Sequence, residues 1–156
     1  MSAARILDLA KARGWRIATA ESCTGGMVAV ALTDIAGSSA VFERGFVTYT
    51  NLAKQQMLGV RGETLAAHGA VSEPVAREMA EGALTHSDTH LAVAITGIAG
   101  PGGSEFKPEG RVCFAIACAG RITQTETVEF GALGRAKVRA AACDHALALL
   151  LAALDG

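Results

Sequence analysis

The sequence predicts a three-layer α/β/α sandwich, in which helices cover both faces of a mixed, mostly parallel sheet of about five strands. Segments with helical periodicity alternate with short apolar runs along most of the chain. One run, residues 91–96, is long enough for a strand and apolar throughout, which is typical of a central strand covered on both faces. Two later runs are separated by Gly120, which indicates an antiparallel hairpin.

The first half of the chain alternates between helix and strand. Residues 3–13 have an amphipathic pattern that ends at Gly14, a residue type that commonly follows the last turn of a helix. The next expected elements are a strand over 15–20, a helix over 24–34, a strand over 42–50, and a helix over 52–58 that Asn51 caps.

The second half begins with helices and ends with one. Ser72 followed by Pro74 signals a helix start, because serine caps the first turn and proline fits within it. The expected elements are a helical turn over 64–68 closed by Gly69, a helix from Ser72 to about His86, strands over 91–96, 111–119 and 121–130, and a long helix after Gly134. We find no internal repeat or linker, so residues 1–156 form one expected domain.

Charge and hydropathy limit the classes of partner. The net charge of −1 provides no electrostatic attraction for nucleic acid or an anionic membrane, so we expect neither as a partner. The longest apolar run, residues 146–154, is too short to span a bilayer. Charged residues are spread along the first 16 positions, and this segment has no apolar run of the kind that a signal peptide contains. We therefore expect a cytoplasmic protein.

The cysteines show no CxxC pair and no metal-ligand spacing. Because of this spacing we expect no bound metal, and because the chain shows no export signal we expect reduced thiols. Two of them are five residues apart in one expected strand, so their side chains point to opposite faces of the sheet. The four are Cys23, Cys113, Cys118 and Cys143.

The stretch Thr19-Ala-Glu-Ser-Cys-Thr-Gly-Gly26 joins the first expected strand to the next helix. This order places backbone amides and a hydroxyl at the carboxyl end of a strand, where open α/β sheets bind ligands. The two glycines would let a ligand approach the backbone closely. Alternatively, Ser22 is only the N-cap of the helix.

Two further turns follow strands and carry polar groups, residues 49–54 and 96–104. In a mostly parallel sheet these turns gather at one edge. Ser22 is then a candidate nucleophile, with Cys23 as its alternative, and Lys54 is a candidate base if burial lowers its pKa. The alternative for Lys54 is a solvated surface position. The histidines stand in poor positions for a base: His68, His86, His90 and His145.

Residues 96–104 contain four glycines and resemble an anion-binding nest, with a flexible surface loop as the alternative. They do not match the phosphate-binding loop of nucleotide triphosphatases. Arg135 and Arg139 stand four residues apart at the start of the last helix, so they share one face. Such a pair either binds a phosphate or is simply solvated.

Five longer motifs follow one another along nearly the whole chain: Thr19–Gly26, Ile35-Ala-Gly-Ser-Ser39, Phe42–Asn51 with Ala53-Lys54, His68-Gly-Ala-Val-Ser72, and Thr96-Gly-Ile-Ala-Gly-Pro-Gly102. Together they resemble the CinA C-terminal domain family, and the length resembles that of its stand-alone members. The resemblance implies a metal-free, cofactor-free amidohydrolase of the pyridine nucleotide cycle. It would hydrolyse nicotinamide mononucleotide to nicotinic acid mononucleotide and ammonia.

The resemblance also assigns roles to residues. It places the nucleophile on Ser22, the base on Lys54 and a further catalytic side chain on Tyr49. Amides near residues 24–26 would hold the developing oxyanion. The substrate-binding residues that it implies are Glu21, Thr24, Gly25, Gly26, Thr96, Gly97, Gly100 and Arg139.

The chain departs from the family pattern near the glycine-rich loop. The segment from Pro101 to Lys107 is one residue shorter than expected, and Phe106 replaces an acidic residue. Arg111-Val112-Cys113 also differs. These changes bear on substrate contacts and leave the serine–lysine pair intact. The rival function is a non-catalytic nucleotide-binding or regulatory domain. An alanine-rich surface and the two-stranded ribbon favour a homo-oligomer.

Overall fold

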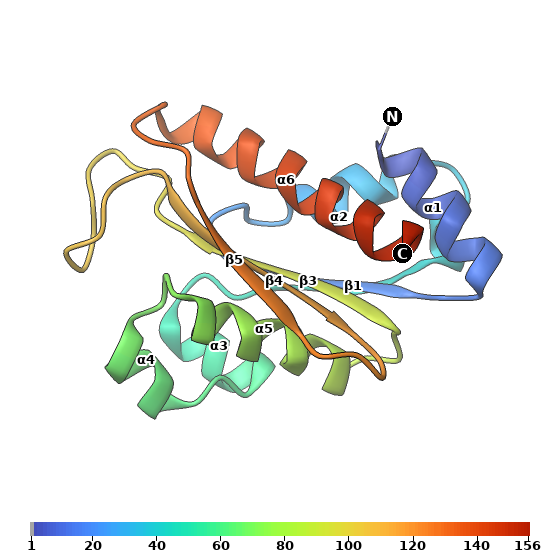
Figure 1. Ribbon diagram of the computed structural model, residues 1–156, viewed down its shortest axis with the longest axis horizontal. Helices are drawn as coiled ribbons and strands as arrows, with labels where there is room; N and C mark the ends of the chain where they lie inside the picture. Colours follow the sequence, from blue (N-terminus) through green and yellow to red (C-terminus); the bar gives the residue numbers. More distant parts are fainter. Residues whose placement is uncertain (1) are drawn as a thin grey trace.

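The computed structural model describes residues 2–156, and within them one five-stranded sheet lies between two layers of helices (Figure 1). The strands stand in the order β2-β1-β3-β4-β5. β1 pairs in parallel with β2 and β3, while β4 is antiparallel to both β3 and β5, so four strands share one direction. The predicted mixed, mostly parallel sheet is confirmed. The strand bounds are β1 (Ile17–Glu21), β2 (Phe42–Val47), β3 (Leu91–Gly97), β4 (Arg111–Cys118) and β5 (Gln124–Glu129).

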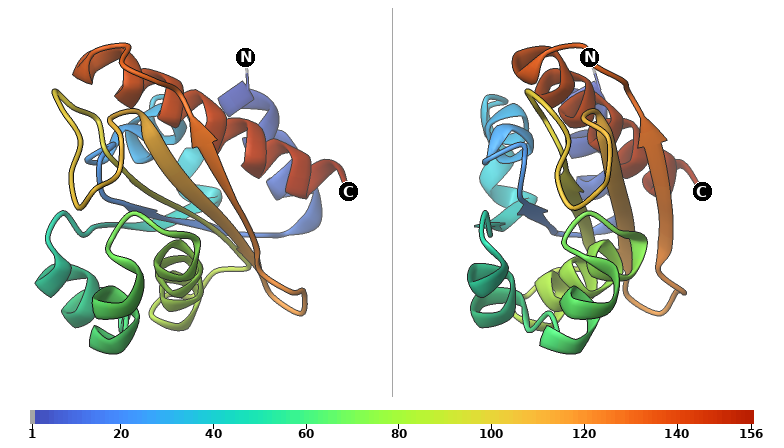
Figure 2. Two further views of the ribbon diagram at one scale, coloured as in Figure 1. Left: turned by 60° about the vertical axis from the view of Figure 1, so that its left-hand side comes forward. Right: turned by 90° about the vertical axis from the view of Figure 1, so that its left-hand side faces the viewer.

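The helices divide between the two faces of the sheet, which confirms the three-layer arrangement. Figure 1 shows α1, α2 and α6 above the sheet and α3, α4 and α5 below it, and the turned views of Figure 2 agree. The helix bounds are α1 (Ser2–Arg13), α2 (Met27–Thr33), α3 (Asn51–Leu58), α4 (Gly62–His68), α5 (Glu73–Thr85) and α6 (Arg135–Asp155), with a short 3-10 helix η1 (Ser38–Ala40).

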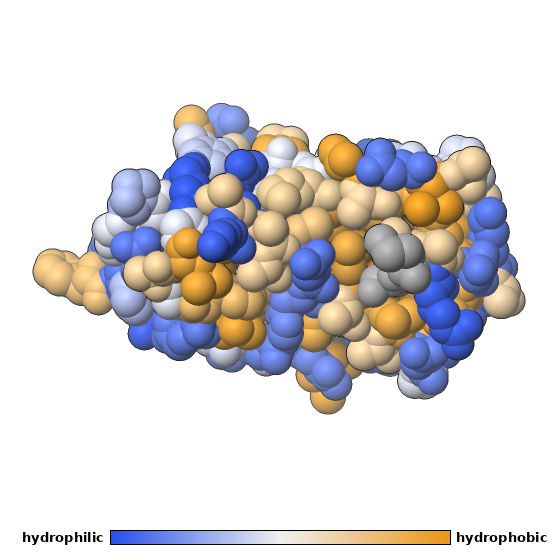
Figure 3. Space-filling view, turned by 90° about the horizontal axis from the view of Figure 1, so that it is seen from above, coloured by the Kyte–Doolittle hydropathy of each residue, from blue (hydrophilic) through white to orange (hydrophobic). Residues whose placement is uncertain are grey.

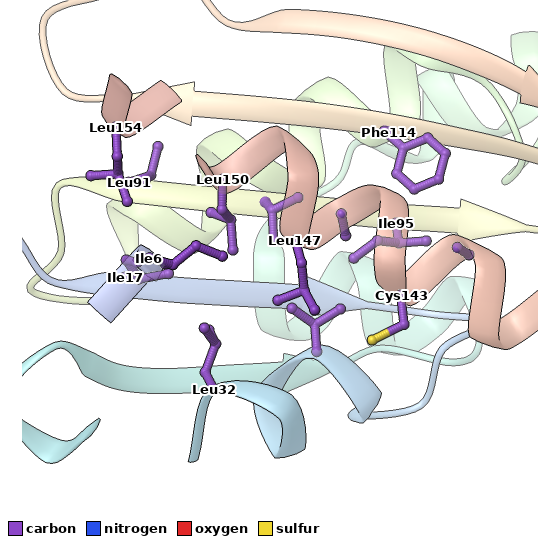
Figure 4. Packing of buried hydrophobic residues seen from close by; sticks show 14 of the residues in the cluster. Ile6, Ile17, Leu32, Leu91, Ile95, Phe114, Cys143, Leu147, Leu150 and Leu154 are labelled. Atoms are coloured by element: carbon purple, nitrogen blue, oxygen red, sulfur yellow. The ribbon is translucent and has the colours of Figure 1, made fainter. Parts of the chain in front are cut away.

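The two faces of the sheet carry side chains of different size. Towards α5 the central strands present buried alanines, Ala18, Ala20, Ala92 and Ala94. Small side chains let this helix approach the sheet closely. Towards α6 the sheet presents larger side chains, and Figure 4 shows Leu91 near Leu150 and Ile95 near Cys143 of the helix, with Phe114 in the same cluster. Alternation of the side chains along each strand separates the two clusters.

The cysteines follow the same alternation. Cys113 packs between the sheet and α5, and Cys118 packs between the sheet and α6. The two side chains therefore lie on opposite faces of the sheet, as their spacing predicts. All four thiols are buried and unpaired. The two residues of β4 therefore cannot form a disulfide with each other.

Gly82 is expected to be the most sensitive glycine in a helix interior. A Cβ at this position of α5 would overlap the carbonyl oxygen of Leu58, at the end of α3. Although alanine normally stabilises a helix relative to glycine, we expect Gly82→Ala to lower the free energy of unfolding by about 2 kcal/mol, because the backbone must move. Urea denaturation measures the change. The matched control is Gly62→Ala in α4, where the nearest atom lies 3.5 Å from the new Cβ; equal effects in both variants would contradict the steric explanation.

Two predicted helix starts are wrong. α2 begins at Met27, and its N-cap is Gly26 in a left-handed conformation (φ 107°) without a side-chain cap, so Ser22 is not the cap. α3 begins one residue earlier than predicted, and Thr50 caps it by accepting a hydrogen bond from the amide of Ala53 at 3.1 Å. In each case the chain turns into the helix at a residue other than the one with the best capping side chain.

The outer face of the upper layer is mixed in polarity. Figure 3 shows apolar and hydrophilic residues interspersed over this face of the molecule. Among residues 2–156 we find no helix that combines the length and the apolar character needed to cross a bilayer.

Candidate active site

A pocket of about 290 Å³ lies where three chain segments that follow strands meet. Ser22 follows β1, Tyr49 and Lys54 follow β2, and the glycine-rich loop after residue 96 follows β3. All three segments line the pocket, together with Ala70 from the connection between α4 and α5. The sequence-based expectation that these turns gather at one edge of the sheet is confirmed.

The backbone holds Ser22 from several sides. Its amide donates to the carbonyl oxygen of Ile95 in β3 at 2.9 Å, and its own carbonyl oxygen accepts from the amide of Gly25 at 3.1 Å. Ser22 as a whole is only 7% exposed. Its Oγ lies 3.0 Å from Nζ of Lys54. A hydroxyl and an amine are thus held at hydrogen-bonding distance inside a buried site.

Lys54 is 1% exposed, an unusual environment for an ammonium group. Burial lowers the pKa of its amine from 10.5 to about 8, and nearby Cys23 and Glu105 only partly oppose the shift. Nζ also lies 2.9 Å from the carbonyl oxygen of Thr48 and 3.4 Å from that of Tyr49. In the neutral amine these two carbonyls can accept both N–H groups, which leaves the lone pair for the Ser22 proton. The geometry therefore suits proton transfer from Ser22 to Lys54.

Cys23 is a poor substitute for Ser22. Burial raises the pKa of its thiol to about 11, although Arg139 and Lys54 counteract the shift. A thiolate, the nucleophilic form, is therefore scarce at neutral pH. The neighbouring hydroxyl has an amine within reach, so Ser22 is the better candidate nucleophile.

Three residues of the turn between Ser22 and α2 were expected to bind substrate, but Thr24, Gly25 and Gly26 do not line the pocket. Thr24 is fully buried, and Gly25 and Gly26 adopt positive φ angles of 57° and 107°. The Gly25 amide already donates to Ser22, so it is not free for an oxyanion. Glu21 is fully buried and bonds the amides of α2. Of the substrate-binding residues inferred from the resemblance, Thr96, Gly97 and Gly100 line the pocket.

The glycine-rich loop encloses a carboxylate of the chain itself. Oε1 of Glu109 accepts a hydrogen bond from the amide of Gly102 at 3.1 Å. Gly100 has a φ of 91°, and a Cβ there would collide with the Glu109 carboxylate. At Gly102 the predicted anion-binding turn is therefore satisfied internally by Glu109. Sequence reasoning missed this residue, because an acidic side chain after a polar loop gives no sign of where it folds.

The two arginines of α6 have different surroundings. Arg135 lines the pocket and donates to the carbonyl oxygen of Gly100 and to the hydroxyl of Tyr49, both at 2.8 Å. Nε of Arg139 instead donates to the carbonyl oxygen of Cys23 at 2.9 Å, and Arg139 is not one of the residues that line the pocket. The resemblance assigned substrate binding to Arg139, whereas the structure brings Arg135 to the pocket.

Lys107 is a pocket residue that sequence reasoning did not single out. Its Nζ donates to the carbonyl oxygens of His68 and Val71, both at 2.6 Å, and so ties the glycine-rich loop to the connection between α4 and α5. The only available signal was a lysine within a loop that already looked functional. None of the four histidines lines the pocket. Residues 2–156 contain no cluster of three or more His, Cys, Asp or Glu side chains that could hold a metal ion.

Comparison with known proteins places the chain in a family. The model of the CinA C-terminal domain matches residues 1–154. The chain belongs to the CinA C-terminal domain family. A relative from Escherichia coli (strain K12), named nicotinamide-nucleotide amidohydrolase PncC, is 69% identical over 110 residues, or 70% of this chain and 67% of that protein. A CinA-like protein from Syntrophobacter fumaroxidans is 52% identical over 139 residues, or 88% of this chain and 32% of that protein.

Solved structures of CinA proteins have the same fold. The competence/damage inducible protein CihA from Agrobacterium tumefaciens superposes with a TM-score of 0.95 at 50% identity, covering 99% of this chain and 94% of that chain. The competence damage-inducible protein A from Klebsiella pneumoniae gives a TM-score of 0.94 at 42% identity, covering 99% and 95%. The CinA-like α/β fold predicted from the motifs is thus confirmed over almost the full length.

Proposed function

We propose that the chain is a nicotinamide-nucleotide amidohydrolase, which hydrolyses the carboxamide of nicotinamide mononucleotide through a Ser22–Lys54 dyad. The single observation that carries the proposal is the 3.0 Å separation of Ser22 Oγ and Lys54 Nζ, two buried residues that line the pocket. The name of the Escherichia coli relative supports the substrate. The reaction would belong to pyridine nucleotide recycling.

The proposed reaction has two halves. Neutral Lys54 takes the proton of Ser22 while Oγ attacks the carboxamide carbon, and the tetrahedral intermediate forms. Lys54 then returns that proton to the departing nitrogen, so ammonia leaves and an ester to Ser22 remains. A water molecule next gives a proton to Lys54 and attacks the ester, and the returning proton restores Ser22 as nicotinic acid mononucleotide is released.

Positive side chains at the pocket suit the phosphate of the substrate. Arg135 and Lys107 both line the pocket, and Arg135 stands in the first turn of α6. A guanidinium can bind two phosphate oxygens at once. Tyr49, whose hydroxyl accepts from Arg135, would then orient this arginine and the substrate at the mouth of the site.

The pH dependence should report the state of Lys54. Because the proposed base is the neutral amine and its pKa is about 8, protonation on lowering the pH removes the active form. We expect kcat/KM for ammonia release to rise by about tenfold per pH unit up to pH 8 and to level off above it. Rates measured between pH 6.5 and 9.5 test this. A profile that is flat below pH 8, or one that falls as the pH rises, would contradict Lys54 as the base.

A single assay separates the proposed function from its rivals. Purified protein is incubated with nicotinamide mononucleotide, and both ammonia and substrate binding are measured. Ammonia release supports the amidohydrolase. Binding without ammonia favours a non-catalytic nucleotide-binding or regulatory domain. The assay is repeated with other amides, and turnover of those amides only favours a transferase that acts on a different phosphorylated small molecule. The homo-oligomer and the cytoplasmic location stay predictions, which light scattering and cell fractionation respectively can test.

A further inference from the structure

The carboxylate of Glu21 is bonded within the fold instead of facing the pocket. Glu21 is fully buried, its Oε1 accepts from the amide of Val28 at 3.0 Å, and its Oε2 accepts from the amide of Ala29 at 3.1 Å. Both amides belong to the first turn of α2, whose N-cap, Gly26, has no side chain to bond them. Amides of a first helical turn have no partner within the helix, and a negative charge there is favourable. Glu21 therefore serves as the cap of α2 from outside the helix.

The main chain of Glu21 is fixed as firmly as its side chain. Its carbonyl oxygen accepts from the amide of Thr48 at 2.9 Å, and the next amide, that of Ser22, donates to Ile95 at 2.9 Å. The turn of residues 22–26 carries the proposed nucleophile. Its start is thus held in the sheet, and its end is held through α2 by the Glu21 carboxylate. Ser22 is the first residue of the turn that lies between these two attachments.

We propose that Glu21 is a positioning residue, which fixes the turn of residues 22–26 so that the Ser22 hydroxyl stays in line with Lys54. The assignment rests on the proposed function. It replaces the substrate contact that the resemblance implied for Glu21. A displacement of about 1 Å in a reacting group can lower a rate by about 100-fold, so the loss of this attachment should slow the chemical step. Substrate affinity should change little, because Glu21 does not line the pocket.

The test is Glu21→Gln, which keeps the shape of the side chain. Glutamine can accept only one of the two hydrogen bonds and turns an N–H group towards the other amide. We expect kcat for ammonia release from nicotinamide mononucleotide to fall about 10- to 100-fold while KM stays within about twofold. Glu21→Asp, which keeps the charge but is one methylene shorter, should lower kcat in the same way and provides a second variant.

Glu78→Gln is the matched control. Glu78 of α5 also accepts a backbone amide, that of Arg61 before α4, at 2.9 Å, but it lies outside the pocket. A control with wild-type kcat shows that losing a carboxylate hydrogen bond to a helix start is not by itself enough to slow the reaction. An unchanged kcat in both Glu21 variants, or a KM raised at least about tenfold at constant kcat, would overturn the positioning role.

A second readout does not depend on the substrate. A fluorophosphonate forms a phosphorus–oxygen bond with an activated serine hydroxyl and releases fluoride, and intact mass spectrometry measures the rate at Ser22. We expect slower labelling in Glu21→Gln than in the wild type and in Glu78→Gln; equal rates would contradict the proposal. A wild-type protein that is labelled at Ser22 but releases no ammonia would refute the proposed function alone.

Discussion

Replacing Ser22 by alanine should lower the rate of ammonia release from nicotinamide mononucleotide by at least about 10³-fold. The hydroxyl is the proposed nucleophile, and Cys23 cannot substitute for it, since burial keeps the pKa of this thiol at about 11. The fold should remain intact. The substitution removes the side-chain hydrogen bond to Lys54 Nζ but leaves the backbone hydrogen bonds of residue 22 unaffected. Steady-state ammonia production by wild type and variant measures the loss.

Ser39→Ala serves as the control for Ser22→Ala. Ser39 is an exposed serine in η1, away from the pocket, so its variant should keep the wild-type rate. Binding of nicotinamide mononucleotide to Ser22→Ala, measured by calorimetry, should persist. If Ser22→Ala retained more than about a tenth of the wild-type rate, covalent catalysis by Ser22 would be wrong.

Replacing Lys54 by methionine should also remove at least about 10³-fold of the rate. Methionine fills a similar volume, but its thioether is not basic enough to take the Ser22 proton at the proposed step. Folding should tolerate the change, because a thioether avoids the cost of burying an amine at Lys54, a residue that is only 1% exposed. Thermal unfolding monitored by circular dichroism separates lost chemistry from lost structure.

Lys54→Arg sharpens the test of the base. Arginine keeps a positive charge but cannot give up a proton in the working pH range, so this variant should be as inactive as Lys54→Met. Lys137→Met, at an exposed position of α6, should keep the wild-type rate. An active Lys54→Arg protein would mean that Lys54 acts by its charge and that another group takes the proton.

Much of the fold could be predicted from the sequence, because its signals are local. The apolar run of β3 and the alternation within β4 require only the sequence spacing of neighbouring residues. The errors fall at turns, where a distant group replaces the local one. Ser22 has a suitable side chain for a helix cap, yet the carboxylate of Glu21 reaches across the turn and bonds α2 instead.

The sequence by itself determined the order of the elements and predicted that the turns after the strands meet at one edge of the sheet. That prediction made Ser22 and Lys54 candidate partners in one site. Only the tertiary structure decided which polar side chains face the pocket. Arg135 and Arg139 look alike in sequence, yet Arg135 lines the pocket and bonds Tyr49, whereas Arg139 bonds the Cys23 carbonyl oxygen and does not line the pocket. The reason is physical: the direction of a long side chain, and the pKa of a buried one such as Lys54, depend on groups that only folding brings near.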